Sequence, residues 1–170
     1  MIVAFFDFDG TITQKDSFLD FIYFTKGKKA FFKGLLLHFF SLAGYKLSLV
    51  SGKAVKENLL TYFFKNTSID DFKKMGIKYT ENRLPVILNP KALAKIEWHK
   101  KQGHEIVIVT ASINYWIQEW SNSLELSLIS TQLEIKNNIL TGKLLGANCN
   151  GIEKVNRVML AYNVQKLEDS

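Results

Sequence analysis

Two aspartates lie two positions apart where an apolar run near the start of the chain ends. The run, residues 2–8, is rich in β-forming side chains and leads into the motif Asp7-Phe8-Asp9-Gly10-Thr11. Carboxylates at i and i+2 of a strand point the same way, and such close like charges are costly unless a cation or a shared proton relieves them. Mg²⁺, which prefers oxygen ligands, is the natural cation. The pattern favours a metal-assisted site, and the other interpretation is an acidic turn that Asp9 and Gly10 merely shape.

The elements that position these aspartates are predicted from periodicity and from start and stop signals. Asn89-Pro90 predicts a helix start, and Gly103 predicts its end after about thirteen residues. The run Glu105–Thr110 predicts a buried strand, 113–123 a helix, 126–130 a strand, Asn137-Asn138 the turn of a hairpin, and 152–164 a last helix. The alternation predicts an α/β fold, a Rossmann-like parallel sheet wrapped by helices.

Residues 14–84 show helix signals without strand signals between them, and they predict a block of four helices. The pattern Ser17-x-x-Asp20 predicts a capping box, Gly27 a stop, and about 29–50 a second long helix, while Ser68-x-x-Asp71 predicts another box. We therefore expect a core domain made of residues 1–13 and 85–170. The segment 14–84 is expected to form a helical cap inserted after the first strand.

Composition excludes several classes of protein. With 170 residues, 47% hydrophobic and 22% charged, the chain is close to the globular average, which excludes disordered and fibrous proteins. The single cysteine, Cys149, excludes an internal disulfide. The N-terminus lacks the pattern of a signal peptide, and the longest uncharged runs, of 12 and 13 residues, fall short of the ~18 that span a bilayer. These features predict a cytoplasmic protein.

The net charge of +6 is concentrated in the predicted cap. Residues 14–84 carry 13 Lys/Arg against 6 Asp/Glu, a balance of +7, and 14 of the 22 aromatics. In one interpretation the aromatics pack inside the cap and the lysines are solvated. In the other, the segment makes peripheral contact with an anionic membrane, at the inner membrane face of the cell. Nucleic acid is not expected as a partner, because no recognised binding motif accompanies the charge.

The ordered motifs resemble those of the haloacid dehalogenase-like (HAD) superfamily. The first is Asp7-x-Asp9-Gly10-Thr11, the second is the apolar strand that ends in Thr110-Ala111-Ser112, and the third is Lys154 in Gly151-Ile-Glu-Lys154. The inserted helices are similar to the cap of the phosphoserine phosphatase-like branch (subfamily IB). Leu140-Thr-Gly142 resembles a subgroup of which some members act on lipid phosphates.

The resemblance implies a role for each motif residue. Asp7 would be the nucleophile that forms an aspartyl-phosphate, and Asp9 the general acid and base. Mg²⁺ would be bound by Asp7 and by the backbone carbonyl of Asp9. Thr110 would hold phosphate oxygens together with the amides that follow it at a helix N-terminus, and Lys154 would screen charge.

Further residues are expected to contact phosphate or substrate. They are Gly10, Thr11, Ala111 and Ser112 from the motifs, and Asp16, for which capping of a helix is the other interpretation. His38, His99 and His104 lack metal-ligand spacing and are expected to be structural or exposed.

The family's fourth motif, an apolar strand followed by Gly-Asp and a further Asp, is not apparent before the end of this sequence. Asp169-Ser170 echoes it without a preceding strand, and Asp169 is expected to be a surface residue. The first hypothesis is a Mg²⁺-dependent phosphatase that hydrolyses a phosphomonoester, either a small phosphorylated metabolite or a lipid phosphate. The alternative is a truncated or inactive member whose basic aromatic cap is a membrane- or partner-binding module.

Overall fold

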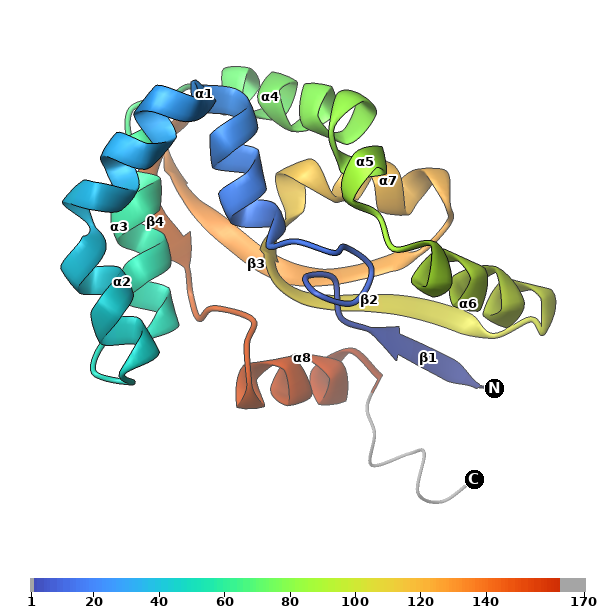
Figure 1. The fold of residues 1–170 in the computed structure, drawn as a ribbon. Coiled ribbons are helices and arrows are strands. Elements are labelled where there is room, and N and C mark those ends of the chain that lie inside the picture. Colours follow the sequence, from blue (N-terminus) through green and yellow to red (C-terminus); the bar gives the residue numbers. More distant parts are fainter. Residues whose placement is uncertain (1, 163–170) are drawn as a thin grey trace.

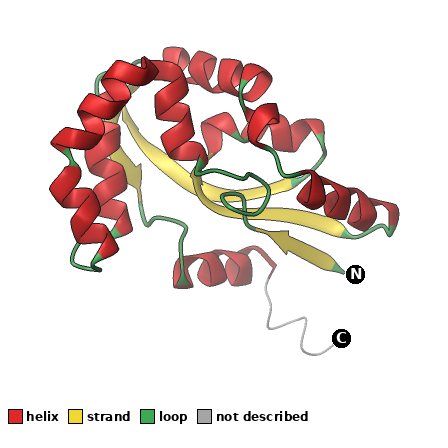
Figure 2. Cartoon of the chain, in the orientation of Figure 1, coloured by secondary structure: helices red, strands yellow, loops and turns green. Residues whose placement is uncertain are grey.

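The structure is a computed structural model that describes residues 2–162, in which six helices follow the first strand before the second strand begins. Figure 1 shows the arrangement, and Figure 2 separates helices from strands. The elements are, in order, β1 (Val3–Phe6), α1 (Ser17–Leu37), α2 (Phe39–Lys46), α3 (Gly52–Phe64), α4 (Ile69–Asn82), α5 (Leu84–Ile87), α6 (Pro90–Lys101), β2 (Glu105–Ile113), the 3-10 helix η1 (Asn114–Trp116), α7 (Gln118–Ser123), β3 (Ser127–Lys136), β4 (Ile139–Leu145) and α8 (Ile152–Tyr162).

The strands form one mixed sheet in the order β1-β2-β3-β4. β2 pairs in parallel with β1 and with β3, and β4 is antiparallel to β3. Helices connect the parallel strands, as crossover connections require. The predicted α/β fold with a Rossmann-like sheet wrapped by helices is confirmed.

Helices lie on both faces of the sheet at β1. Because successive strand residues point to opposite faces, Phe6 packs against His99 of α6 and Phe5 packs against Tyr162 of α8. The ring centroids are 5.7 Å apart in the first pair and 5.5 Å in the second. The carboxyl end of β1, where Asp7 follows, therefore lies between two helical layers.

Four helices, α1 to α4, occupy the predicted cap segment, as expected. The predicted stop at Gly27 corresponds to a break inside α1, because Gly27 has the non-helical angles φ 76° and ψ 166° and two helical segments meet there at a kink. The second segment ends at Leu37, and α2 then begins after His38. The predicted single helix over 29–50 is thus wrong. The predicted box at Ser68 is confirmed, since its hydroxyl accepts a hydrogen bond from the amide of Asp71 at 3.1 Å.

The capping box predicted at Ser17 is wrong. Asp16 caps α1 instead, with its carboxylate accepting from the Leu19 amide at 2.9 Å. Asp20 is buried and forms a two-pronged ion pair with Arg83, whose Nη2 lies 2.7 Å from Asp20 Oδ1 and whose Nε lies 2.8 Å from Oδ2. A distant arginine therefore fixes the carboxylate that the local pattern assigned to the helix start.

The strand that contains Thr110 is longer than predicted. β2 continues to Ile113, and the 3-10 helix η1 and α7 then cover 114–116 and 118–123, so the predicted helix over 113–123 is helical for most of its length but begins one residue late and is interrupted at Ile117. Ile113 is fully buried and pairs with Thr131 after a register shift, which holds this segment in the sheet. The amides of Ala111 and Ser112 consequently belong to extended backbone and not to a helix N-terminus.

The other turn and helix signals agree with the structure. Asn89 caps α6 with Pro90 at its first position, and the hairpin turns at Asn137 and Asn138, whose φ values are 49° and 61°. β3 is one strand of ten residues that continues from the predicted strand into the hairpin. Val164, the predicted end of the last helix, and Asp169 lie outside the described residues.

One hydrophobic cluster joins the inserted helices to the sheet and its following turn. Phe21 of α1 stacks on Trp116 of η1 with centroids 4.5 Å apart. Gly76 of α4 lies so close to η1 that a Cβ there would be 2.1 Å from the Tyr115 carbonyl oxygen. α1 and α4 are therefore packed directly onto the end of β2 and the turn that follows it.

Candidate active site

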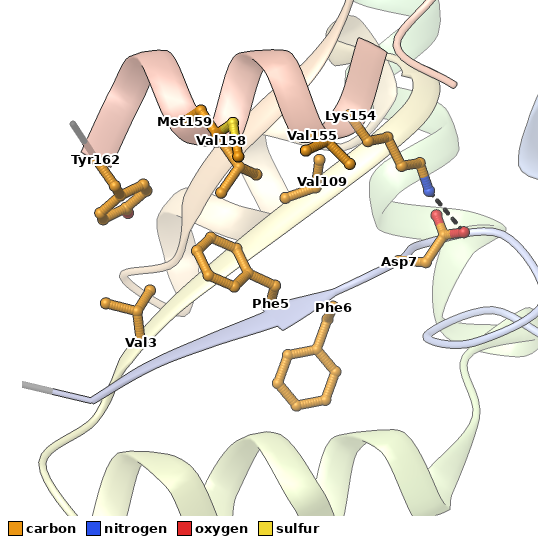
Figure 3. A pocket seen from close by; sticks show the side chains of 10 residues that line it. All are labelled: Val3, Phe5, Phe6, Asp7, Val109, Lys154, Val155, Val158, Met159 and Tyr162. Carbon is orange, nitrogen blue, oxygen red and sulfur yellow. Dashed lines mark ion pairs between the residues drawn. The ribbon is translucent and has the colours of Figure 1, made fainter. Parts of the chain in front are cut away.

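Asp7 lies directly after β1, and the side chain of Lys154, in the first turn of α8, points to it. The Lys154 Nζ is 2.7 Å from Asp7 Oδ2, and the other carboxylate oxygen accepts the Phe8 amide at 2.7 Å. Figure 3 shows this ion pair at one end of a pocket between β1 and α8. The Asp7 side chain is 45% exposed, so it remains accessible to a ligand.

The position of Lys154 depends on how α8 is anchored. Arg157, one turn further along α8, donates to the Ser130 carbonyl at 2.7 Å and to the Ala147 carbonyl at 2.8 Å. Its Nε also pairs with Glu153 at 2.7 Å. These bonds tie the start of α8 to β3 and to the loop before the helix, and thereby hold the lysine beside Asp7.

Both carboxylate oxygens of Asp9 accept hydrogen bonds. Oδ1 accepts from the Ser17 amide at 2.7 Å, and Oδ2 accepts from the Ser112 hydroxyl at 2.5 Å. The first donor begins α1 and the second lies near the end of β2. Asp9 thus joins the first loop, the inserted helices and the sheet at one point.

The Ser112 hydroxyl belongs to a chain of hydrogen bonds with a defined direction. The Trp116 indole N–H donates to Ser17 Oγ at 3.1 Å, and the oxygens of Ser17 and Ser112 are 2.8 Å apart. Because an indole N–H can only donate, Ser17 accepts from Trp116 and donates to Ser112, which in turn donates to Asp9. All three donor residues are buried.

Burial raises the pKa of the Asp9 carboxyl, and the charge of Asp16 raises it further, while the hydrogen bonds from Ser112 and Ser17 oppose the shift. An accessible carboxylate and a half-buried carboxyl of raised pKa therefore lie two residues apart. Enzymes that give two carboxyl groups different roles use such a difference in environment.

A cavity of about 400 Å³ lies between the inserted helices and the sheet. It mixes acidic, basic and apolar side chains. Its lining residues are Asp7, Asp9, Asp16, Phe18, Leu19, Leu42, Tyr45, Lys46, Gly52, Val55, Lys56, Leu59, Ala111, Ser112, Asn148, Asn150 and Lys154. The structure thus brings Asp7, Asp9, Asp16, Ala111, Ser112 and Lys154, all predicted from the sequence, to one cavity.

Three predicted residues lie apart from this lining. Thr110 is fully buried, and its hydroxyl accepts the Ser112 amide at 2.9 Å. Gly10 has φ 75°, a conformation that suits glycine. The Thr11 carbonyl accepts a hydrogen bond from the Asn89 side-chain amide at 3.0 Å. In this structure Gly10 and Thr11 shape the loop that carries the aspartates, and Thr110 supports the end of β2 that carries Ser112.

Lys56 of α3 enters the cavity and was not predicted. Its Nζ donates to the Ala111 carbonyl at 2.5 Å and to Asn148 Oδ1 at 3.1 Å. Burial lowers the pKa of this lysine, and the charges of Asp16, Asp9 and Cys149 partly oppose the shift. The sequence around Lys56 indicates only that this lysine belongs to a basic segment. Asn148 carries a clearer indication, because it lies in a polar loop shortly before Lys154.

A second cavity, of about 490 Å³, extends from Asp7 and Lys154 along β1 and α8. Apart from that ion pair its lining is apolar or aromatic, as Figure 3 shows: Val3, Phe5, Phe6, Val109, Val155, Val158, Met159 and Tyr162. The charged chemistry is therefore confined to the end of this pocket at which it meets Asp7.

Comparison with known proteins gives consistent matches. The sequence profile of the haloacid dehalogenase-like hydrolases matches residues 4–169. Protein CicA of Caulobacter vibrioides (strain NA1000 / CB15N) is 32% identical over 160 residues, which cover 93% of this chain and 71% of CicA.

Solved structures are similar at lower identity. A protein of unknown function from Bordetella pertussis Tohama I has a TM-score of 0.77 at 18% identity, covering 94% of this chain and 72% of that one. A HAD family hydrolase from Salmonella enterica serovar Typhi has a TM-score of 0.68 at 18% identity, covering 98% and 52%. A phosphoserine phosphatase that carries a phospho-aspartyl intermediate analogue has a TM-score of 0.63 at 15% identity, covering 97% and 72%. At such identities the similarity establishes the fold, and function has to be argued from the site.

Proposed function

The chain belongs to the haloacid dehalogenase-like hydrolase family, and from this premise we propose that it is a phosphatase that hydrolyses a phosphomonoester. The observation that carries the proposal is the accessible Asp7 carboxylate, 2.7 Å from the Lys154 ammonium, in a cavity that also contains Asp9. A nucleophile, a cation and a proton donor are the groups that phosphoryl transfer to a carboxylate requires.

Asp7 attacks phosphorus in line with the ester bond. A bond forms between a carboxylate oxygen of Asp7 and phosphorus, the bond from phosphorus to the ester oxygen breaks, and an aspartyl-phosphate results. The Lys154 ammonium lowers the repulsion between the carboxylate and the anionic phosphoryl group. The exposed fraction of Asp7 supports this role, because a nucleophile must be reached by its substrate.

Asp9 supplies the proton that the leaving oxygen takes up. In the second step it removes a proton from the water that attacks the aspartyl-phosphate, which releases inorganic phosphate and restores Asp7. The raised pKa of Asp9 favours its protonated form before the first step. The donors Ser17 and Ser112 hold its carboxyl group in place for both steps.

The donor set fits Mg²⁺. In the described residues 2–162 no three His, Cys, Asp or Glu side chains cluster as a preformed metal cage. Mg²⁺ is commonly held by one or two carboxylates, with waters and substrate phosphate completing its shell, and the exposed Asp7 carboxylate is such a ligand. We propose that Asp7 and the backbone carbonyl of Asp9 hold it. When bound, it would neutralise charge on the transferring phosphoryl group.

The cavity lining supports an anionic substrate with apolar surface nearby. Lys46 and Lys56 contribute positive charge, while Phe18, Leu42 and Leu59 contribute apolar area. A small phosphorylated metabolite and a lipid phosphate both satisfy this description. We propose that residues 14–84 act as the cap that selects between them, since four of these five side chains belong to α2 and α3 and the fifth to α1.

The test is hydrolysis of p-nitrophenyl phosphate with Mg²⁺ or with EDTA. Wild-type protein should release p-nitrophenol only with Mg²⁺, and Asp7→Asn should reduce release to background. Asp70→Asn, which changes an exposed aspartate in the first turn of α4, serves as the matched control and should keep full activity. Turnover that EDTA does not reduce would exclude the metal, and turnover that survives in Asp7→Asn would exclude the mechanism.

A further inference from the structure

The segment that contains the second half of α1, α2 and the residues just after α2 exposes large apolar side chains. Phe40 is 86% exposed, Leu36 76% and Leu49 79%. We call this the α1–α2 surface; its apolar residues are Phe32, Leu36, Leu37, Phe39, Phe40, Leu47 and Leu49. Other aromatics of the same segment, such as Phe21 and Phe64, are buried in the common core. Core packing thus explains only part of the aromatic content. Several large apolar side chains exposed within one short segment point to an interaction site.

The charge around this surface has one sign. From Phe21 to Lys56, both included, the chain contains seven lysines and no aspartate or glutamate. Four of these lysines, Lys28, Lys29, Lys33 and Lys46, are exposed on or beside the α1–α2 surface. The partner of this surface should therefore be anionic and should offer an apolar layer as well.

We propose that the α1–α2 surface docks on the face of an anionic lipid bilayer. Aromatic and leucine side chains would enter the boundary between headgroups and acyl chains, and the lysines would lie among anionic headgroups, as in interfacial helices. In residues 2–162 no helix is both long and apolar enough to cross a membrane. The kink at Gly27 and the eight-residue length of α2 suit a segment that lies along a surface.

Two other partners fit less well. A second copy of the chain would bring the same lysines against each other, because a two-fold interface pairs like surfaces. Nucleic acid would satisfy the lysines through its phosphates but would leave the exposed leucines in water. A bilayer with anionic headgroups satisfies both features.

Docking would place the membrane beside the polar cavity of about 400 Å³. Leu42, Tyr45 and Lys46 of α2 line that cavity, while Phe39 and Phe40 of the same helix belong to the α1–α2 surface. Figure 1 shows α2 at the outer end of the inserted helices, away from β1. The docking itself does not depend on the proposed catalytic function, so its test needs no activity.

The test is co-sedimentation of the full chain with vesicles of phosphatidylcholine alone or mixed with phosphatidylglycerol, at low and high salt. Wild-type protein should bind the mixed vesicles more tightly, and salt should weaken that binding. Phe40→Ser should lower the affinity about tenfold. Lys33→Gln should lower it about fivefold on mixed vesicles and leave binding to neutral vesicles unchanged.

Matched controls separate docking from general stickiness. Leu160→Ser removes a side chain of α8 that is 85% exposed, and Lys91→Gln removes an exposed lysine of α6; neither should change binding. Circular dichroism checks that each variant folds. Absence of binding to mixed vesicles at low salt overturns the proposal, as does binding that Phe40→Ser leaves intact. Self-association that Phe40→Ser abolishes, without vesicle binding, would overturn it in favour of a second copy.

Discussion

Replacing Ser112 with alanine removes one of the two donors to the Asp9 carboxylate. The hydroxyl donates a hydrogen bond to Asp9 Oδ2 at 2.5 Å, and it also accepts a hydrogen bond from the Ser17 hydroxyl. The Asp9 carboxyl group loses the hydrogen bond from Ser112 but retains the one that the Ser17 amide donates to Oδ1 at 2.7 Å. The substitution therefore tests whether the buried chain of hydrogen bonds positions Asp9.

The expected size of the effect follows from the charge of the acceptor. A hydrogen bond to a charged group contributes about 1.5 to 3 kcal/mol, which corresponds to about ten- to a hundredfold in rate if it is needed in the transition state. Because the Ser17 amide remains, we expect the lower end, about tenfold in kcat. The Ser17 hydroxyl also loses its acceptor in a buried site, so the free energy of unfolding should fall by about 1 to 3 kcal/mol.

The sign of the pH effect can be worked out for Asp9. Its pKa is raised by burial and by Asp16, so its contribution to stability is present at low pH and is lost as the pH rises through that pKa. The Ser112 hydroxyl lowers the pKa, and alanine should raise it further. The loss of stability should then be larger at about pH 7, where Asp9 is more ionised, than at about pH 4.

Urea unfolding at both pH values and p-nitrophenyl phosphate kinetics measure these effects. Ser121→Ala is the matched control, because this buried serine of α7 donates to the Gln118 carbonyl at 3.0 Å and does not contact Asp9. It should keep its kcat and lose stability equally at both pH values. A Ser112→Ala enzyme with wild-type kcat and a pH-independent loss of stability would refute the role given to this chain of hydrogen bonds.

Three further substitutions or reagents test the structure. Asp20→Ala leaves the Arg83 guanidinium without the carboxylate that pairs with it at 2.7 Å, and should lower the free energy of unfolding by about 3 kcal/mol; a loss under about 0.5 kcal/mol, typical of surface changes, would contradict the pairing. Gly76→Ala places a Cβ 2.1 Å from the Tyr115 carbonyl oxygen and should cost about 1 to 3 kcal/mol, seen as a lower Tm, whereas an unchanged Tm would show that the two segments lie further apart. Burial raises the pKa of the Cys149 thiol, so a disulfide reagent should label it only after unfolding, and rapid labelling of the native protein would exclude the buried position.

The position of Asp7 was predictable from the sequence pattern, whereas its partner Lys154 was expected only from the resemblance to the haloacid dehalogenase-like motifs. A short apolar strand that ends in aspartates predicts an acidic group at the carboxyl edge of the sheet, where ligands of open α/β sheets bind. The same alternation of elements predicted the parallel strands β1, β2 and β3. These features depend on residues that are close in sequence, and periodicity detects such residues well.

The contacts of Lys56 and Asp20 could not be predicted from local sequence patterns. Lys56 contacts the Ala111 carbonyl across 55 positions, and Asp20 pairs with Arg83 across 63 positions. The local pattern Ser17-x-x-Asp20 matches a capping box, but a buried ion pair with a distant arginine takes the carboxylate away from the helix start. Such contacts depend on how the inserted helices pack on the sheet, and short-range patterns carry no information about that packing.

The strand that contains Thr110 shows a similar limit. Residues 113–123 have helical periodicity, yet Ile113 pairs with Thr131 and is fully buried in the sheet. Burial against β3 outweighs local propensity at this position. As a result Ser112 lies in the sheet facing Asp9, which no pattern in its own segment indicated.

The central claim, that Asp7 is the nucleophile, is tested most directly by trapping the intermediate. Acid quenching during turnover of p-nitrophenyl phosphate, followed by peptide mass spectrometry, should find a phosphoryl group on Asp7 that hydroxylamine removes, and none in Asp7→Asn. Asp70→Asn should give the wild-type result. A phosphoryl group on another residue, or turnover that continues in Asp7→Asn, would contradict the mechanism.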